Sequence, residues 1–294
     1  MQSIEKYAII FIRIPKGDFE EEDMQPKTEQ LEKYFAKSSS LADRNISFNV
    51  FDELDSTNSE ARRFAVKDGL GRREARAFVA LSQSAGRGRM GRSFFSPSAS
   101  GLYFTILFDV SGNTPEKMLC LTPAAAVAVV RVAEQLGVRG TRIKWVNDIL
   151  IDGKKACGIL AESFTVGDKR YAAVGIGINL FTDSFPAELE SIATSFFDGS
   201  ASGGEKLGVL CRTAELLACE LCDLKKMIDG DDLSYMDEYR RASAVLGRRV
   251  SYVKEGVEHF GEAVAVDDLG RLSVREDSGD TAVLSGGEIS LFLK

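Results

Sequence analysis

The sequence predicts an α+β fold, in which a mixed central sheet with flanking helices is followed by a small C-terminal β domain. Strand-like and helix-like stretches interleave between about residue 45 and residue 246. From Arg248 onward, short alternating runs are separated by glycine-containing turns, which is typical of a small all-β unit. We therefore expect three segments: an N-terminal extension over residues 1–44, a main domain over 45–246 and a β domain over 247–294.

The N-terminal extension carries weak signals. A strand is expected over residues 8–14, a polar loop over 17–27 and a short helix over 28–37. The run Ser38-Ser39-Ser40 is interpreted as a linker to the main domain.

The first half of the main domain begins with a strand and a capped helix. Thr57 offers an N-cap and Glu60, three residues later, completes a capping box, so a helix should follow and stop at Gly69. A buried strand then leads directly into a loop of glycines and arginines. Strands are expected here over residues 47–54, 77–83 and 101–108, and the helix over 59–67.

The second half contains a helix, a hairpin and two further helices. Thr122-Pro123 should start an alanine-valine helix that ends at Gly137, because proline suits the first helical turn. Asp152-Gly153 has the composition of a tight hairpin turn. Strands are expected over residues 142–145, 149–152, 155–162 and 171–180, and helices over 205–228 and 234–246.

Charge and composition exclude several classes of protein. The net charge of -7 gives no general nucleic-acid footprint, so any anion site must be local. No stretch approaches about 18 consecutive apolar residues, and the apolar start lacks a cleavage site, so we expect a cytoplasmic protein without a membrane contact.

The cysteines and the histidine suggest packing rather than chemistry. Five cysteines without a paired framework indicate reduced thiols. Cys219 and Cys222 form a CxxC in a helical, leucine-rich stretch, where small apolar side chains are favoured over a metal or redox pair. His259 is the single histidine, which excludes a His-rich metal site.

The glycine-arginine loop over residues 83–92 is the first candidate site. Arg87, Arg89 and Arg92 alternate with glycines, which let the backbone approach a ligand, while arginine offers a forked, permanently charged donor set for carboxylate or phosphate. A solvated basic loop is the alternative. No Gly-Lys-Ser/Thr follows, so this is not a Walker loop.

Three later stretches are further candidates. They are Lys144-Trp145-Val146-Asn147-Asp148, the lysine hairpin GKKACGIL over residues 153–160, and Gly175-Ile176-Gly177-Ile178-Asn179. Lys155 could bury its stem and direct its amine along the sheet, or it could be a surface lysine with a snorkelling stem. Glycines weaken a strand, so those at 175 and 177 suggest close approach of a ligand or another backbone, with simple packing as the alternative.

Together with Ser56-Thr57-Asn58, these motifs resemble the biotin–protein ligases of the biotin/lipoate ligase family. The resemblance runs from about Asp55 to Leu180 and resumes at Gly286-Gly287-Glu288-Ile289-Ser290-Leu291. It implies a catalytic domain like that of class II aminoacyl-tRNA synthetases and an SH3-like C-terminal barrel. It also implies an ATP-dependent, AMP-forming reaction through biotinyl-adenylate, with Mg²⁺ as cofactor and a carrier domain of biotin-dependent carboxylases as partner.

The resemblance also assigns roles to individual residues. Those implied to bind biotin are Ser56, Thr57, Asn58, Gln83, Gly86, Arg87, Gly88, Arg89, Lys155 and Gly158. Those implied to bind ATP are Arg89, Arg92, Phe94, Lys144, Asn147 and Asn179. Lys155, Arg89 and Asp148 are the expected catalytic residues, with Asp148 also the expected metal ligand.

The chain departs from the family pattern at two positions. Phe94 stands where tryptophan is usual, and Val146 stands where proline is favoured. No helix-turn-helix pattern is visible, so we expect no DNA partner and no repressor function. Lipoate–protein ligase and a non-catalytic biotin or adenylate sensor are the alternative functions, and the oligomeric state is left open, with a homodimer as one option.

Overall fold

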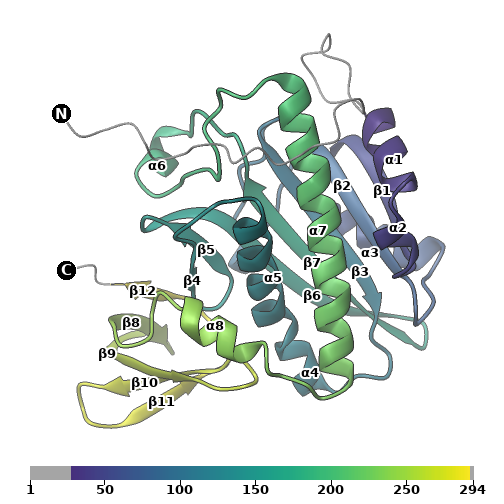
Figure 1. Ribbon diagram of the computed structural model, residues 1–294. Helices are drawn as coiled ribbons and strands as arrows, with labels where there is room; N and C mark the ends of the chain where they lie inside the picture. The colour runs from purple at the N-terminus through teal and green to yellow at the C-terminus, as the bar shows by residue number, and fades with distance from the viewer. Residues whose placement is uncertain (1–27, 292–294) are drawn as a thin grey trace.

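A computed structural model describes residues 28–291 of the chain. The strand expected over residues 8–14 and the loop over 17–27 lie outside the described residues. The described part has a seven-stranded sheet with helices against it and a separate five-stranded sheet (Figure 1). This arrangement confirms the predicted α+β class, with a mixed sheet followed by a small β unit.

The seven-stranded sheet has the strand order β1-β2-β3-β7-β6-β5-β4. Strands β1 and β2 run parallel, and every other neighbouring pair is antiparallel. The alternating and buried apolar runs of the sequence therefore become strands close to where they were expected. The bounds are Ile46–Leu54 (β1), Ala75–Gln83 (β2), Gly101–Asp109 (β3), Arg142–Lys144 (β4), Asp148–Ile151 (β5), Lys154–Val166 (β6) and Lys169–Asn179 (β7).

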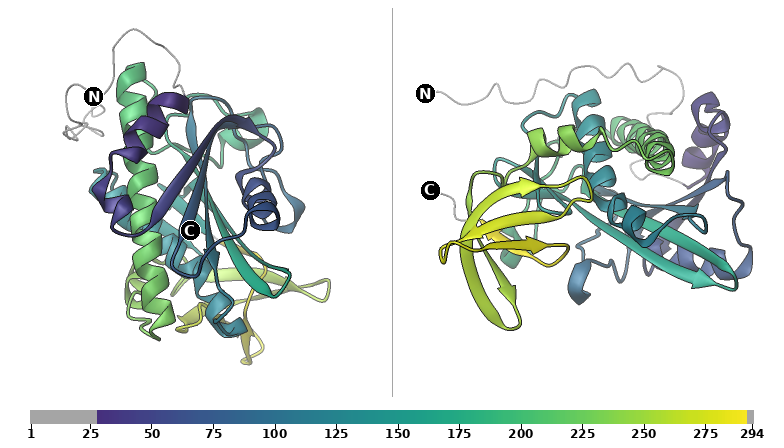
Figure 2. Two further views of the ribbon diagram at one scale, coloured as in Figure 1. Left: turned by 90° about the vertical axis from the view of Figure 1, so that its right-hand side faces the viewer. Right: turned by 90° about the horizontal axis from the view of Figure 1, so that it is seen from below.

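Two long helices cover one face of this sheet. They are α5, Leu121–Gln135, and α7, Gly203–Asp229, and they pack against each other (Figures 1 and 2). Helix α3, Thr57–Lys67, lies on the opposite face against β2, β3 and β7. Both faces of the sheet are thus buried, which agrees with the nearly continuous apolar character of β3.

The alanine-valine segment is the most apolar helical region of residues 28–291. By length and composition, Pro115–Gln135 would suit a membrane span. Most of α5 is instead buried between the sheet and α7, so the segment is a core helix. A short helix α4, Pro115–Leu119, runs into α5, so Pro123 is the third residue of α5 and not its first.

The linker interpretation of Ser38-Ser39-Ser40 is wrong. Ser38 caps α2, Ser39–Ala42, and its hydroxyl also donates to Glu215 of α7. The preceding helix α1, Thr28–Ala36, buries Leu31 and Phe35 in the main core. A serine run resembles a linker in sequence, but contacts with a distant helix order this one.

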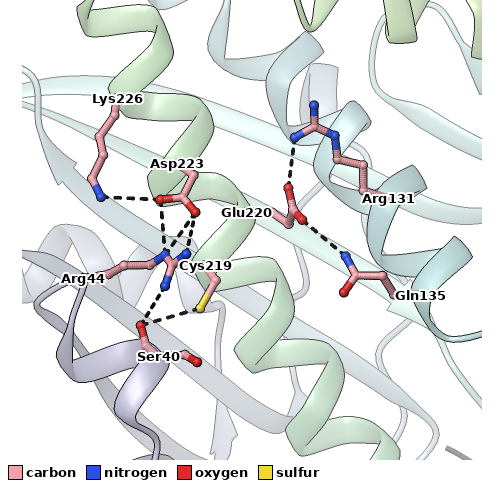
Figure 3. Close-up of polar contacts among 8 residues, drawn as sticks. All are labelled: Ser40, Arg44, Arg131, Gln135, Cys219, Glu220, Asp223 and Lys226. Carbon is pink, nitrogen blue, oxygen red and sulfur yellow. Dashed lines mark hydrogen bonds and ion pairs between the residues drawn. The ribbon is translucent and has the colours of Figure 1, made fainter.

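Figure 3 shows how the turn after α2 is held against α7. Arg44 binds Asp223 with its Nη2 2.7 Å from Oδ2. The Cys219 thiol lies 3.9 Å from the Ser40 carbonyl oxygen, which agrees with a packing role for the CxxC. All five cysteines are free thiols, as predicted.

The capping box predicted for α3 is wrong by one residue. Ser56 is the N-cap and makes no side-chain cap hydrogen bond, while Thr57 is the first helical residue. Glu60 pairs with Arg63 instead of the cap. Helix α8, Met236–Ala242, is shorter than the expected 234–246, and α6, Ala187–Glu190, was not predicted.

The five-stranded sheet is antiparallel throughout and has the order β11-β10-β9-β8-β12. It lies beside β4 and β5 (Figures 1 and 2, yellow). Trp145 connects the two units, because its indole N–H donates to the Gly270 carbonyl at 2.8 Å. The bounds are Arg249–Lys254 (β8), Val257–Val266 (β9), Leu272–Glu276 (β10), Thr281–Leu284 (β11) and Ile289–Leu291 (β12).

Candidate active site

A cavity of about 510 Å³ lies between the main sheet, the glycine-arginine loop and the C-terminal β domain. Most residues of the predicted site line it, although they come from four separate stretches of sequence. These are Ser56, Thr57, Asn58, Gln83, Arg87, Gly88, Arg89, Arg92, Phe94, Lys144, Asn147, Asp148, Lys155 and Gly158.

Two residues of the predicted site do not line the cavity. Gly86 lies at the base of the loop, where its carbonyl accepts from the Phe94 N–H at 2.9 Å. Asn179 is buried, and its side-chain amide donates to the Thr194 carbonyl at 3.0 Å. Their direct contacts with biotin and ATP therefore have no support from this geometry.

A chain of contacts joins the two cations expected to act in catalysis. Lys155 Nζ lies 2.7 Å from Asp148 Oδ1, and Arg89 Nη1 donates to Asn147 Oδ1 at 2.7 Å. The Asn147 amide in turn donates to Asp148 Oδ1 at 3.1 Å. Arg89 and Lys155 thus reach one wall of the cavity through the adjacent residues Asn147 and Asp148.

The hairpin of β5 and β6 positions Lys155 and Asn147. Asp152 and Gly153 both have positive φ, as the predicted tight turn requires. On the facing strands, the Ile159 N–H donates to the Asn147 carbonyl at 2.9 Å, and the Asn147 amide returns a hydrogen bond to the Ile159 carbonyl at 3.1 Å. Asn147 is therefore fixed by backbone contacts before it meets Arg89.

The glycine-arginine loop folds back on itself instead of extending into solvent. The Gly88 N–H donates to the Arg92 carbonyl at 2.7 Å, and the short 3₁₀ turn Arg89–Gly91 lies between them. Arg87 pairs with Glu162 of β6 at 2.8 Å, and Arg92 pairs with Glu288 of the C-terminal domain at 2.6 Å. Each arginine of the loop thus contacts a different element, which rules out a simple solvated basic loop.

A polar network lies beneath the cavity. The Thr57 N–H donates to Gln83 Oε1 at 2.9 Å, which ties the start of α3 to the end of β2. The buried Thr105 hydroxyl lies 2.6 Å from Asn58 Oδ1. Asn58 Nδ2 donates to Glu162 Oε2 at 2.9 Å. Sequence reasoning missed Thr105 and Glu162, which carry no motif of their own.

The glycines of β7 make room for side chains from two other elements. A Cβ on Gly175 would lie 2.1 Å from Asn58 Oδ1, and one on Gly177 would lie 2.5 Å from Phe94 Cε1. The close packing that the sequence offered as the alternative is therefore present at both glycines. Both also line the cavity, so the approach of a ligand to them stays a prediction.

The C-terminal domain supplies a further part of the cavity lining that the sequence did not predict. One of these residues, Glu288, belongs to the Gly-Gly-Glu-Ile-Ser-Leu motif that carried the family resemblance. The lining residues of β8 belong to no such motif. The lining residues from this domain are Ser251, Tyr252, Val253, Glu258, Gly287, Glu288, Ile289 and Ser290.

No cysteine nucleophile is available at Lys155. Burial raises the pKa of the neighbouring Cys157 thiol, although the charge of Lys155 opposes the shift. The thiol is fully buried and stays protonated at neutral pH. Burial likewise raises the pKa of Tyr103, on the cavity wall, to about 12, so this phenol is also neutral. The charge near Lys155 and Arg89 is therefore carried by basic groups and carboxylates.

Asp148 is a weak metal site by itself. Its Oδ1 already contacts Lys155 and Asn147. Within residues 28–291, no group of three or more His, Cys, Asp or Glu side chains is placed to hold a metal ion. Mg²⁺ keeps several waters and binds phosphate oxygens with one or two carboxylates, so such a group is not required. The role of Asp148 as a ligand stays a prediction.

Cations on one wall of the cavity and a glycine-rich loop beside them, in an α+β fold, suit the class of enzymes that bind anionic substrates. Residues 54–179 match the Biotin/lipoate A/B protein ligase family, and residues 245–291 match the Biotin protein ligase C terminal domain. The bifunctional ligase/repressor BirA of Bacillus subtilis is 33% identical over 248 residues, which are 80% of this chain and 71% of that protein. The chain belongs to the biotin/lipoate A/B protein ligase family, and its two matched regions are those of a biotin protein ligase.

Other relatives extend the comparison. The biotin–[acetyl-CoA-carboxylase] ligase of Mycobacterium tuberculosis is 28% identical over 72% of this chain and 77% of its own length. A BirA of Bacillus spizizenii is 39% identical over 54% of this chain, and the match spans about half (49%) of that relative's length. The biotin protein ligase of Aquifex aeolicus in complex with biotin and ATP has a TM-score of 0.63 and 27% identity, covering 84% of this chain and 99% of that one.

Proposed function

We propose that this protein uses ATP to activate biotin and then transfers the biotinyl group to a lysine of a carrier domain. In the first step a carboxylate oxygen of biotin attacks the α-phosphorus of ATP, and pyrophosphate leaves. In the second step the lysine amine attacks the acyl carbon of biotinyl-adenylate, AMP leaves and the amine loses a proton. One observation carries the proposal: Arg89 and Lys155 line the same cavity and are joined through Asn147 and Asp148.

The first step must bring two anions together. Two unit charges ~4 Å apart repel by about 4 kcal/mol at an effective dielectric of about 20. Lys155 and Arg89 offset this repulsion and stabilise the charge that develops on the phosphorus oxygens. Both cations are held at the cavity wall by partners, Lys155 by Asp148 and Arg89 by Asn147.

The glycine-arginine loop covers the bound substrates. Gly88 lets the backbone approach a ligand, and Arg87 lines the cavity beside it. Phe94 packs over Gly177 and offers an aromatic surface to the ligand in place of the family's tryptophan. A loop that closes over the adenylate keeps water away from a reactive anhydride.

Asp148 is our candidate for the second step. Its carboxylate contacts Lys155 on the cavity wall, and we propose that the incoming lysine amine approaches the acyl carbon beside it. A carboxylate in that position orients the amine and accepts a hydrogen bond from it. Lys144 and Arg92 also line the cavity and are our candidates for contacts with the nucleotide phosphates. Asn147 acts there by holding Arg89, because both of its amide donors are already used.

Mg²⁺ fits this site as the companion of ATP and not as a resident ion. The nucleotide phosphates would supply most of its ligands, and Asp148 Oδ2 is the oxygen of that carboxylate left for it by Lys155 and Asn147. The ion would neutralise charge on the phosphates and on the leaving pyrophosphate.

The substrate and the catalytic role are tested by one assay. Purified protein is given ATP and Mg²⁺ with either biotin or lipoate, and exchange of labelled pyrophosphate into ATP is measured. We expect exchange with biotin alone. Exchange with lipoate alone would favour the lipoate–protein ligase, and tight biotin binding without any exchange would favour a sensor.

The partner is a carrier domain of a biotin-dependent carboxylase, as the name of the Mycobacterium tuberculosis relative suggests. The cytoplasm stays the predicted compartment. A homodimer and the absence of a DNA partner stay predictions, to be tested by sedimentation and by a DNA-binding assay.

A further inference from the structure

Glu162 lies at the junction of two motifs of the site without lining the cavity. It belongs to β6, seven residues after Lys155, and its side chain is largely shielded from solvent. One carboxylate bonds to the glycine-arginine loop through Arg87 and to the start of α3 through Asn58. A single side chain thus connects three elements that are spread over about a hundred residues of sequence.

The contact with Glu162 uses one of the hydrogen-bond donors of the Asn58 side-chain amide. Its Nδ2 donates to the Leu160 carbonyl at 3.1 Å and to Glu162 Oε2 at 2.9 Å, which are the two donors that an amide has. Its Oδ1 accepts from Thr105 at 2.6 Å and lies 2.1 Å from where a Cβ on Gly175 would stand. Asn58 is therefore a structural anchor, with no donor left for a ligand.

The contact with Arg87 holds the loop down on the sheet. Arg87 Nη2 lies 2.8 Å from Glu162 Oε1, and Nη1 lies 3.0 Å from Oε2, so the pair is bidentate. A bidentate guanidinium–carboxylate pair fixes orientation as well as distance. Because Arg87 adjoins Gly86 and Gly88, the pair sets where the loop backbone crosses the cavity.

We propose that Glu162 is a positioning residue, which orders the biotin end of the cavity by fixing Arg87 and Asn58 in place. The inference rests on the proposed function. Removal of the carboxylate frees the loop, so biotin and its adenylate are held less tightly. The bonds from Lys155 to Asp148 and from Arg89 to Asn147 remain, because neither cation contacts Glu162.

Glu162→Gln isolates the loop contact from the Asn58 contact. The glutamine carbonyl can still accept from Asn58, whereas its charge attraction for Arg87 is gone. We expect the Kd and the KM for biotin to rise about tenfold, as for a hydrogen-bonded charge pair that is partly shielded from water. The kcat at saturating biotin should stay within about twofold, since only substrate binding is weakened.

Asp223→Asn is the matched control. Asp223 of α7 also pairs with a distant arginine, Arg44, at 2.7 Å (Figure 3). Helix α7 covers the face of the sheet opposite to α3, and the start of α3 lines the cavity. This variant loses a comparable ion pair and should keep the wild-type Kd and KM for biotin. If the Kd and KM for biotin rose in both Asp223→Asn and Glu162→Gln, the loss of any ion pair would weaken biotin binding, and Glu162 would have no specific role.

Arg87→Gln tests the same contact from the loop, and the Arg87 side chain is 46% exposed, so its replacement does not threaten folding. The double variant Glu162→Gln/Arg87→Gln should bind biotin about as well as Arg87→Gln alone, because Glu162 acts through Arg87.

Biotin affinity is measured by calorimetry without ATP, and KM by pyrophosphate exchange. An unchanged affinity in Glu162→Gln, or effects that multiply in the double variant, would overturn the positioning role. If the wild-type chain itself bound no biotin, the proposed function would fail first, and the inference with it.

Discussion

Lys155 and Asp148 form an ion pair on the wall of the cavity, with 2.7 Å between Nζ and Oδ1. Asn147, the residue before Asp148, receives Arg89 from the glycine-arginine loop at the same distance. Two motifs that are more than fifty residues apart in sequence therefore meet through two neighbouring side chains.

Lys155→Ala should abolish most adenylate formation without unfolding the protein. Loss of a fixed charge at the developing phosphorane is expected to lower pyrophosphate exchange by about 10²–10³-fold. Lys154→Ala is the matched control, since Lys154 is the adjacent lysine, is exposed and donates to the Glu190 carbonyl. Normal turnover in Lys155→Ala, with a native thermal transition, would refute the role of this lysine.

Arg89→Gly should let biotinyl-adenylate escape. Without the bond to Asn147, the loop loses its contact with the opposite wall, and the intermediate reaches solvent. We expect free adenylate in the filtrate and labelling of lysines on a bystander protein. The double variant with Lys155→Ala should label nothing, and labelling confined to the carrier in Arg89→Gly would count against capping by the loop.

Gly175→Ala should weaken biotin binding through Asn58. The added Cβ would lie 2.1 Å from Asn58 Oδ1, so the amide must move and release Thr105 and Glu162. We expect a loss of about 1–3 kcal/mol in unfolding free energy and a rise of about tenfold in the KM for biotin. Gly204→Ala, in the first turn of α7 with open space around it, should leave the KM for biotin unchanged and should not lower the unfolding free energy.

Glu215→Gln should destabilise the protein in a pH-dependent manner. Burial would raise the pKa of Glu215, but hydrogen bonds from Ser38, Tyr34 and Arg212 outweigh it, so the folded-state pKa is lowered. A carboxylate whose pKa is lowered by folding stabilises the protein at pH values above its unfolded-state pKa of about 4.3. This stabilisation is lost as the pH falls through the folded-state pKa. At about pH 7 the variant should be about 2 kcal/mol less stable in urea.

The same measurement at low pH checks the sign of this effect. Below the folded pKa, wild-type Glu215 is protonated and resembles glutamine, so the difference in unfolding free energy should shrink. A difference that stays constant from about pH 7 to about pH 3 would contradict the account.

The strands and the hairpin could be predicted because their signals are local. Alternation with period two and the Asp152-Gly153 turn depend on neighbouring residues alone. The cap of α3 was misplaced because Ser56 and Thr57 are both good caps, and tertiary contacts with Gln83 and Thr105 decide between them. Local sequence does not contain those contacts.

The candidate site could likewise be predicted only where its signal lies in the local sequence. Motif residues on the cavity wall, such as Arg89 and Lys155, could be predicted from their chemistry and from the resemblance. Their partners could not, because Glu162 and Glu288 are ordinary acidic residues until the fold places arginines beside them. Asn179 is the opposite case. It belongs to a motif, but its side chain donates to the Thr194 carbonyl and does not line the cavity.

Incubation with biotin, ATP, Mg²⁺ and a biotin carrier domain, followed by intact-mass measurement of the carrier, tests the central claim most directly. The account predicts a gain of one biotinyl group on one lysine, dependent on ATP and lost in Lys155→Ala. A carrier that keeps its mass in the presence of the folded wild-type protein, or one that is labelled equally by Lys155→Ala, would contradict it.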